Sequence, residues 1–196
     1  MSYPYSAYAV DLKKVSAAAG SKDKKLEAAL KKKFADEYTE NSEWFADALK
    51  KGAPTLEKAI SEIIAGTVPK KSKHGFQYGY AIEKLVMHFG KRIDDDELGF
   101  GADEAIESFL KKAKQPSFAK LTKTYTFPIV IPVPDDFPVI STMTPANIAA
   151  LQKSLAAIEK SIKAADDDDA LEVTDALKSW CKKAAAKKQA LVLFAY

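Results

Sequence analysis

The spacing of hydrophobic residues predicts a chain built mostly of amphipathic helices. Leu26, Leu30 and Phe34 recur every four residues, and lysines occupy the positions between them. This is the pattern of a helix with one buried face. The same period predicts helices over residues 12–19, 54–66, 76–89, 103–114, 117–123 and 144–165, and a last helix that begins at the Asp166–Asp169 run.

Residues with short polar side chains mark further expected helix starts. We expect Ser21 to cap the helix that contains Leu26, and Asn41 or Ser42 to cap the helix that follows it. The apolar stripe of that following helix should face inward and end at Gly52; it consists of Trp44, Phe45, Ala48 and Leu49.

Both ends of the chain have the composition of strands. The segment from Tyr3 to Leu12 alternates and is rich in Tyr and Val, and residues 189–196 form an uncharged run with strong β preference. An exposed strand of that kind would aggregate, so we expect the two ends to pair. The predicted fold class is α+β, with a small sheet that includes the N- and C-terminal strands, surrounded by about seven helices. We expect a single globular domain over residues 1–196.

Three stretches lack a regular pattern. Residues 67–75 are basic and bounded by Pro and Gly, and residues 92–102 are acidic and contain Gly, so both predict loops. In residues 125–138 prolines interrupt β-branched residues, and each proline removes a backbone donor. This predicts an extended edge or a wrapped connector instead of a central strand.

Composition and charge narrow the class of protein. The 196 residues include one Cys, one Arg and a formal net charge of +3. A single Cys excludes an intramolecular disulfide, and a chain with one Arg is poorly equipped to read nucleic-acid sequence. No apolar run is long enough to cross a membrane, and the N-terminus does not have the pattern of a signal peptide. We therefore expect a cytoplasmic protein without membrane or sequence-specific nucleic-acid partners.

Familiar cofactor and metal motifs are incomplete. The Asp94–Gly99 segment begins like a calcium loop, but Leu98 and Ala105 stand where oxygen ligands belong. The Gly99–Gly101 segment begins like a dinucleotide-binding turn, but Glu104 stands where a small residue belongs. Helix capping accounts for the Asp166–Asp169 run. We therefore predict no metal and no cofactor.

The candidate functional residues lie in two segments, Tyr78–Glu83 and Pro132–Ile140. One interpretation is close packing, in which Gly79 lets another backbone approach and Phe137 fills the core. The other is a cleft that binds a ligand or a partner, for which the candidates are Tyr78, Tyr80, Glu83, His88, Asp135 and Asp136. Cys181 is expected on an inward helix face, where a thiol is unreactive, so no catalytic residue is assigned.

These two segments, together with the start Tyr5–Val10 and the helix-to-strand ending, resemble a family of bacterial proteins catalogued as a domain of unknown function. The layout is more distantly similar to the YfbM-like proteins. The resemblance implies a small bacterial cytoplasmic α+β protein, and no catalytic residues come with it.

Our leading hypothesis is a non-catalytic protein-binding domain, either an accessory protein or an immunity-type partner that neutralises a toxin. Mixed acidic and basic loops would give such a domain charge complementarity. The alternative is a small-molecule-binding protein or enzyme that uses Glu83, His88, Asp135 and Asp136 as acid and base. A third hypothesis, nucleic-acid binding, requires the Lys70–Lys73 loop and the lysines near residue 185 to form one basic stripe.

Overall fold

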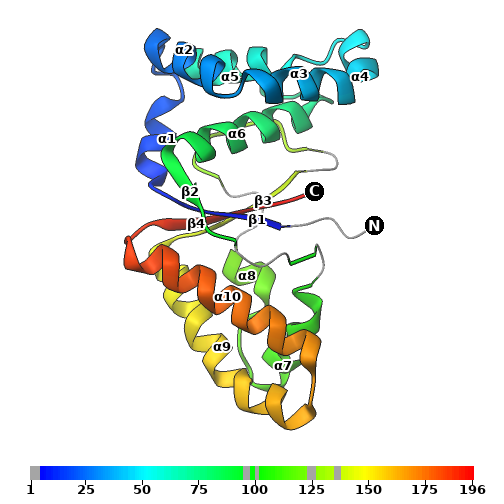
Figure 1. The fold of residues 1–196 in the computed structure, drawn as a ribbon, viewed down its shortest axis with the longest axis vertical. Coiled ribbons are helices and arrows are strands. Elements are labelled where there is room, and N and C mark those ends of the chain that lie inside the picture. The colour runs from blue at the N-terminus through cyan, green and yellow to red at the C-terminus, as the bar shows by residue number, and fades with distance from the viewer. Residues whose placement is uncertain (1–4, 95–97, 100–101, 123–126, 135–137) are drawn as a thin grey trace. The chain divides into compact units, whose positions relative to one another are not determined.

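The computed structural model describes residues 5–94, 98–99, 102–122, 127–134 and 138–196, and these residues form ten helices and four strands (Figure 1). The strands are β1 (Tyr5–Val10), β2 (Gly90–Arg92), β3 (Val139–Met143) and β4 (Ala190–Ala195). The helices are α1 (Leu12–Ala18), α2 (Lys24–Lys33), α3 (Ala35–Trp44), α4 (Ala46–Lys50), α5 (Leu56–Ala65), α6 (Gly75–Phe89), α7 (Glu104–Lys112), α8 (Phe118–Thr122), α9 (Pro145–Ala165) and α10 (Asp168–Ala186). The α+β class is confirmed, with ten helices where about seven were expected.

The chain divides into two compact units. Unit 1 comprises residues 1–10, 91–126 and 140–196, and unit 2 comprises residues 11–90 and 127–139. Each unit is therefore made of segments that are distant in sequence. A single domain over residues 1–196 stays a prediction.

The centre of the sheet in unit 1 is the pair formed by the two chain ends. The strand order is β2-β1-β4-β3, and β1 and β4 are antiparallel, with Tyr5 opposite Ala195 and Val10 opposite Ala190. Every residue of both strands is buried. The predicted pairing is thus confirmed, and the apolar C-terminal run is removed from solvent.

Two long helices of unit 1 pack on each other and on β4 (Figure 1). Helix α9 begins where predicted, because the Thr144 side chain accepts a hydrogen bond from the Asn147 N–H and Pro145 fits the first turn. Helix α10 begins where the Asp167 side chain accepts from the Ala170 N–H. The aspartate run therefore does serve as a cap.

Unit 2 is helical, and α5 and α6 form its closest helix pair. The apolar residues expected to face inward on α5 are buried: Leu56, Ile60, Ile63 and Ile64. Gly66 ends the helix with a φ of +74°, a left-handed conformation that glycine adopts without strain.

Two expected helix starts are wrong. Asn41 lies buried inside α3, which begins at Ala35 because Asp36 and Glu37 stabilise the positive end of the helix in its first turn. The cap of α2 is Asp23, whose carboxylate accepts from two backbone N–H groups, and Ser21 supports it by accepting from the Asp23 N–H.

The apolar stripe expected over Trp44–Leu49 is also interrupted. Phe45 is a non-helical junction between α3 and α4, so the periodicity of Trp44–Leu49 does not belong to one helix. As a result Trp44, expected inward, is 73% exposed.

Two short strands were not expected. Strand β2 lies at the start of a segment predicted as a loop, and β3 follows directly after Pro138. Residues 127–134 form neither helix nor strand, which confirms the predicted connector.

Replacing Phe194 should test the pairing of the chain ends. Phe194 is fully buried in β4, and its ring meets the Tyr8 ring edge-on at 5.8 Å. We expect Phe194→Ala to lower the free energy of unfolding by about 3–5 kcal/mol, because the truncation leaves a cavity in a packed core. Urea denaturation measures this, with Ala156→Ser on the exposed face of α9 as the control. A loss below about 1 kcal/mol would contradict the packing described for the terminal strand.

Candidate functional site

Helix α6 carries a flat face on which the connector of unit 2 packs. A Cβ placed on Gly75 would lie 2.5 Å from the Val133 carbonyl oxygen, and one placed on Gly79 would lie 2.9 Å from ring carbons of Pro138. These separations are too short for any side chain. The backbone approach expected at Gly79 therefore occurs one turn earlier at Gly75, whereas Gly79 receives a proline ring.

The connector buries one side and exposes another. Ile129 and Pro132 are buried, whereas Val130 and Val133 are 86% and 59% exposed. Both pairs are three residues apart, which is the repeat of an extended polyproline-type segment. Packing against α6 therefore leaves two valines facing solvent.

Aromatic side chains continue this exposed surface across α6 to α3. The Phe45 ring lies 4.8 Å from the Phe76 ring and 5.4 Å from the Tyr80 ring, measured between centroids, and all three rings are partly exposed. Trp44 adjoins Phe45 in sequence, and Phe76 directly follows Gly75, against which Val133 packs.

We call the set Trp44, Phe45, Phe76, Tyr80, Val130 and Val133 the apolar surface of unit 2. It contains each of the large hydrophobic residues that are exposed in the described part of the chain. Scattered exposed hydrophobic residues are normal in proteins, but a contiguous group indicates an interaction surface. Sequence periodicity missed this surface, although the repeat of valines three apart between prolines was a usable signal.

Tyr78 is buried and bonded to a carboxylate of a neighbouring helix. Its hydroxyl donates a hydrogen bond to Glu62 of α5 over 2.5 Å, and its ring is buried. Burial, followed by this hydrogen bond, raises the pKa of Tyr78 above its ordinary value. Glu62 was not among the sequence candidates, because nothing in the spacing of α5 identifies which helix it faces.

Glu83 and His88 lie on different sides of α6. Five residues in an α-helix correspond to about 140° of rotation. Glu83 is 5% exposed and forms an ion pair with Lys84 at 3.6 Å. The partly buried His88 has its pKa lowered by burial and, to a smaller extent, by the positive charge of Lys33.

Of the six candidate residues, Asp135 and Asp136 lie outside the described residues, as does Phe137. Tyr80 belongs to the apolar surface through its contact with Phe45. A cleft formed by all six candidates therefore stays a prediction.

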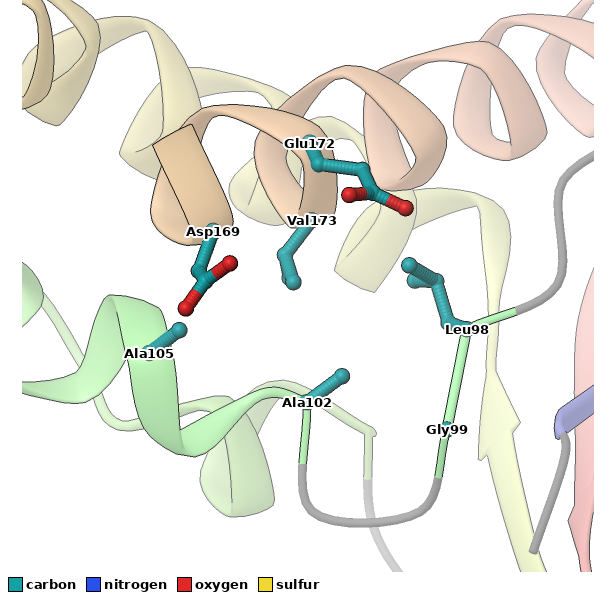
Figure 2. Close-up of a pocket in the computed structure, with 7 residues that line it drawn as sticks. All are labelled: Leu98, Gly99, Ala102, Ala105, Asp169, Glu172 and Val173. Atoms are coloured by element: carbon teal, nitrogen blue, oxygen red, sulfur yellow. The ribbon is translucent and has the colours of Figure 1, made fainter. Parts of the chain in front are cut away.

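Unit 1 has a hollow of about 320 Å³ beside the start of α10. Figure 2 shows the carboxylates of Asp169 and Glu172 directed toward it, above the small apolar residues Ala102 and Ala105. Both residues are exposed, and Asp169 lies in the first turn of α10, where its charge stabilises the positive end of the helix. Glu172 lies one turn further along the helix.

Cys181 is fully buried in α10, and burial raises the pKa of its thiol to about 12. The prediction of an inward-facing Cys181 is confirmed, and a thiol in this state is a poor nucleophile at neutral pH. Among the described residues no group of three His, Cys, Asp or Glu side chains is close enough to hold a metal ion. No helix in the described part of the chain has the length and apolar character needed to cross a bilayer.

The fold and the surface define an α+β protein with an exposed apolar surface on its helical unit. All of residues 1–196 match the family described as Domain of unknown function (DUF7691), and the chain belongs to this family. No curated protein and no solved structure matches the chain. The predicted membership of a family of unknown function is therefore confirmed, whereas a bacterial origin and a likeness to YfbM stay predictions.

Adding one methyl group at Gly75 should displace the connector. Gly→Ala within a helix ordinarily stabilises by about 1 kcal/mol. Here the new Cβ would meet backbone atoms of Pro132 and Val133, so we expect Gly75→Ala to destabilise unit 2 by about 1–3 kcal/mol. Elastase, which cuts after small apolar residues, should then cleave faster after Val130, within the connector.

Gly52→Ala is the control for Gly75→Ala. A Cβ at Gly52 meets nothing within 4 Å, although its φ of +92° strains any side chain. The control should therefore lose some stability while elastase cleavage after Val130 stays slow. Equal cleavage rates in the two variants would show that Gly75 does not position the connector.

Tyr78→Phe should change both stability and its pH dependence. Loss of the hydrogen bond to Glu62 should cost about 1–3 kcal/mol at pH 7. Since the folded-state pKa of Tyr78 is raised, its contribution is complete below the ordinary pKa of 10.0 and is lost as pH rises above it. Urea denaturation between pH 7 and pH 11 measures the difference between the two proteins. A difference that stays constant across pH 10 would refute the assignment.

Proposed function

We propose that this chain is a non-catalytic protein-binding domain that acts through the apolar surface of unit 2, in an accessory or immunity-type role. The observation that carries the proposal is that Trp44, Val130 and Val133, the large hydrophobic residues exposed in the described part of the chain, all belong to unit 2 and flank the Phe45–Phe76 ring contact in sequence or in packing. An exposed tryptophan beside partly exposed Phe and Tyr rings matches the residues that dominate protein–protein binding energy.

The side chains best suited to chemistry are engaged elsewhere. The Tyr78 hydroxyl is bound to Glu62, Glu83 is paired with Lys84, and burial keeps the Cys181 thiol protonated. These contacts support a binding role over catalysis. The aromatic rings of the apolar surface are partly exposed, and rigid rings offer a large contact area at a small loss of conformational entropy.

A partner would bury side chains that folding leaves in water. Covering an exposed aromatic or valine side chain gains about 25 cal/mol for each Å² of apolar surface removed from water. Trp44 lies at the end of α3 with nothing covering it, so its burial is available to a partner. We therefore expect Trp44 to contribute more to the binding free energy of an immunity-type or accessory partner than its neighbours do.

The test is affinity capture from the native host with the wild-type chain and the double variant Trp44→Ser, Val133→Ser. We expect the wild type to retain a stoichiometric protein that the double variant loses by about 10-fold or more, since removal of two interface side chains costs at least 1.4 kcal/mol of binding. Both substituted positions are exposed, so folding should be unchanged, and circular dichroism verifies this.

The matched control is Ala156→Ser, Ala157→Ser on the exposed face of α9 in unit 1. This variant should capture the same protein as the wild type. Capture that is unchanged in the Trp44 variant, or lost equally in the α9 control, would refute the assignment of the apolar surface as the binding site.

A further inference from the structure

In the described part of the chain, exposed acidic residues without an ion-pair partner lie beside Trp44 of the apolar surface, and exposed basic residues without one lie in the loop just before Phe76. From this arrangement we infer that the surface binds the same surface of a second copy of this chain, related by a two-fold axis. The inference rests on the proposed function, because it names one partner of the surface proposed above.

The acidic end is helix α3. Its ten residues contain Asp36, Glu37, Glu40 and Glu43 and no Lys or Arg. Glu40 and Glu43 are exposed, adjoin Trp44, and have no ion-pair partner among the described residues.

The basic end is the loop that leads into α6. Lys70, Lys71 and Lys73 are exposed, and within the described ranges none of them forms an ion pair. The loop is held against the aromatic side chains, because the His74 N–H donates to the Ser72 hydroxyl at 3.0 Å and the His74 ring meets the Phe76 ring edge-on at 6.2 Å.

Ring contacts and sequence adjacency link these groups in a row. Trp44 with its acidic neighbours comes first, then Phe45, then Phe76, and then His74 with its basic neighbours. A two-fold axis near the Phe45–Phe76 pair places the acidic end of one copy opposite the basic end of the other. An interface of this kind requires a self-complementary surface, which this order of groups supplies.

Other classes of partner would be complementary in charge to only part of this surface. A nucleic acid would be attracted by the lysines but repelled by α3, and the one Arg of the chain, Arg92, belongs to unit 1. A purely acidic protein segment would meet the same repulsion. A second copy meets each charged end with the opposite charge, and its own Trp44 is covered in the same step.

Two charge-reversal variants and their mixture test the inference. Glu40→Lys, Glu43→Lys makes both ends basic, and Lys71→Glu, Lys73→Glu makes both ends acidic. We expect the wild type to form a dimer in analytical ultracentrifugation at protein concentrations up to about 0.5 mM, and its dissociation constant to rise about 10-fold or more between low and high salt. Each variant alone should stay monomeric, whereas their equimolar mixture should form a heterodimer about as tightly as the wild type pairs with itself.

Three results would overturn the inference: a wild type that stays monomeric at low salt, a dimer that both reversals leave intact, or variants that fail to pair when mixed. Tighter binding of a single-stranded oligonucleotide than of a second copy would also overturn it. All four substituted positions are exposed, and the urea midpoint of each variant shows whether it is folded.

The two proposals fail separately. A monomeric wild type that still captures another protein through Trp44 removes the self-association and leaves the proposed function standing. A dimer with the expected charge dependence, together with no Trp44-dependent capture of any other protein, confirms the self-association and removes the accessory or immunity-type role.

Discussion

The antiparallel pairing of β1 with β4 is the constraint on which unit 1 depends. The pair joins residues 5–10 to residues 190–195 at the centre of the sheet, and both strands are buried along their full length. The sheet is complete only when the last residues of the chain reach the first. Closing so long a loop costs entropy that local contacts cannot offset until the strands are in register. The buried apolar residues of β4 supply the compensating free energy.

The sequence showed this pairing because an uncharged β-forming run has few stable alternatives to burial in a sheet. Helix starts were predictable where one cap stood alone, as at Thr144, and uncertain where several capping residues competed, as at Ser21 and Asp23. Strand β2 was not predicted, because the three residues Gly90–Arg92 are too few to show an alternating pattern. Strand β3 was hidden because Pro138 made the residues before it resemble a continuing connector.

The candidate site shows a different limit of sequence analysis. Periodicity states which residues share a helix face, but it does not state whether anything covers that face. Trp44 was therefore expected inward, although the break at Phe45 leaves it in solvent. The partner of the Tyr78 hydroxyl, Glu62, lies on another helix, and no spacing within α6 identifies it. Gly79 indicated that something packs closely on α6, because a glycine inside a helix is costly unless something occupies the space, but the group at Gly79 is a proline ring and the backbone approach lies at Gly75.

The connector gives the strongest reason to regard the apolar surface as functional. Folding requires Ile129 and Pro132, which are buried, and it requires glycine at position 75, where the connector backbone approaches α6. It does not require valine at positions 130 and 133, because polar side chains would be equally well accommodated at positions that are more than half exposed. The same holds for a tryptophan at position 44, whose large ring contributes little burial to the fold. Three exposed apolar side chains that folding does not need are what the proposed binding role would explain, since a partner would remove them from water.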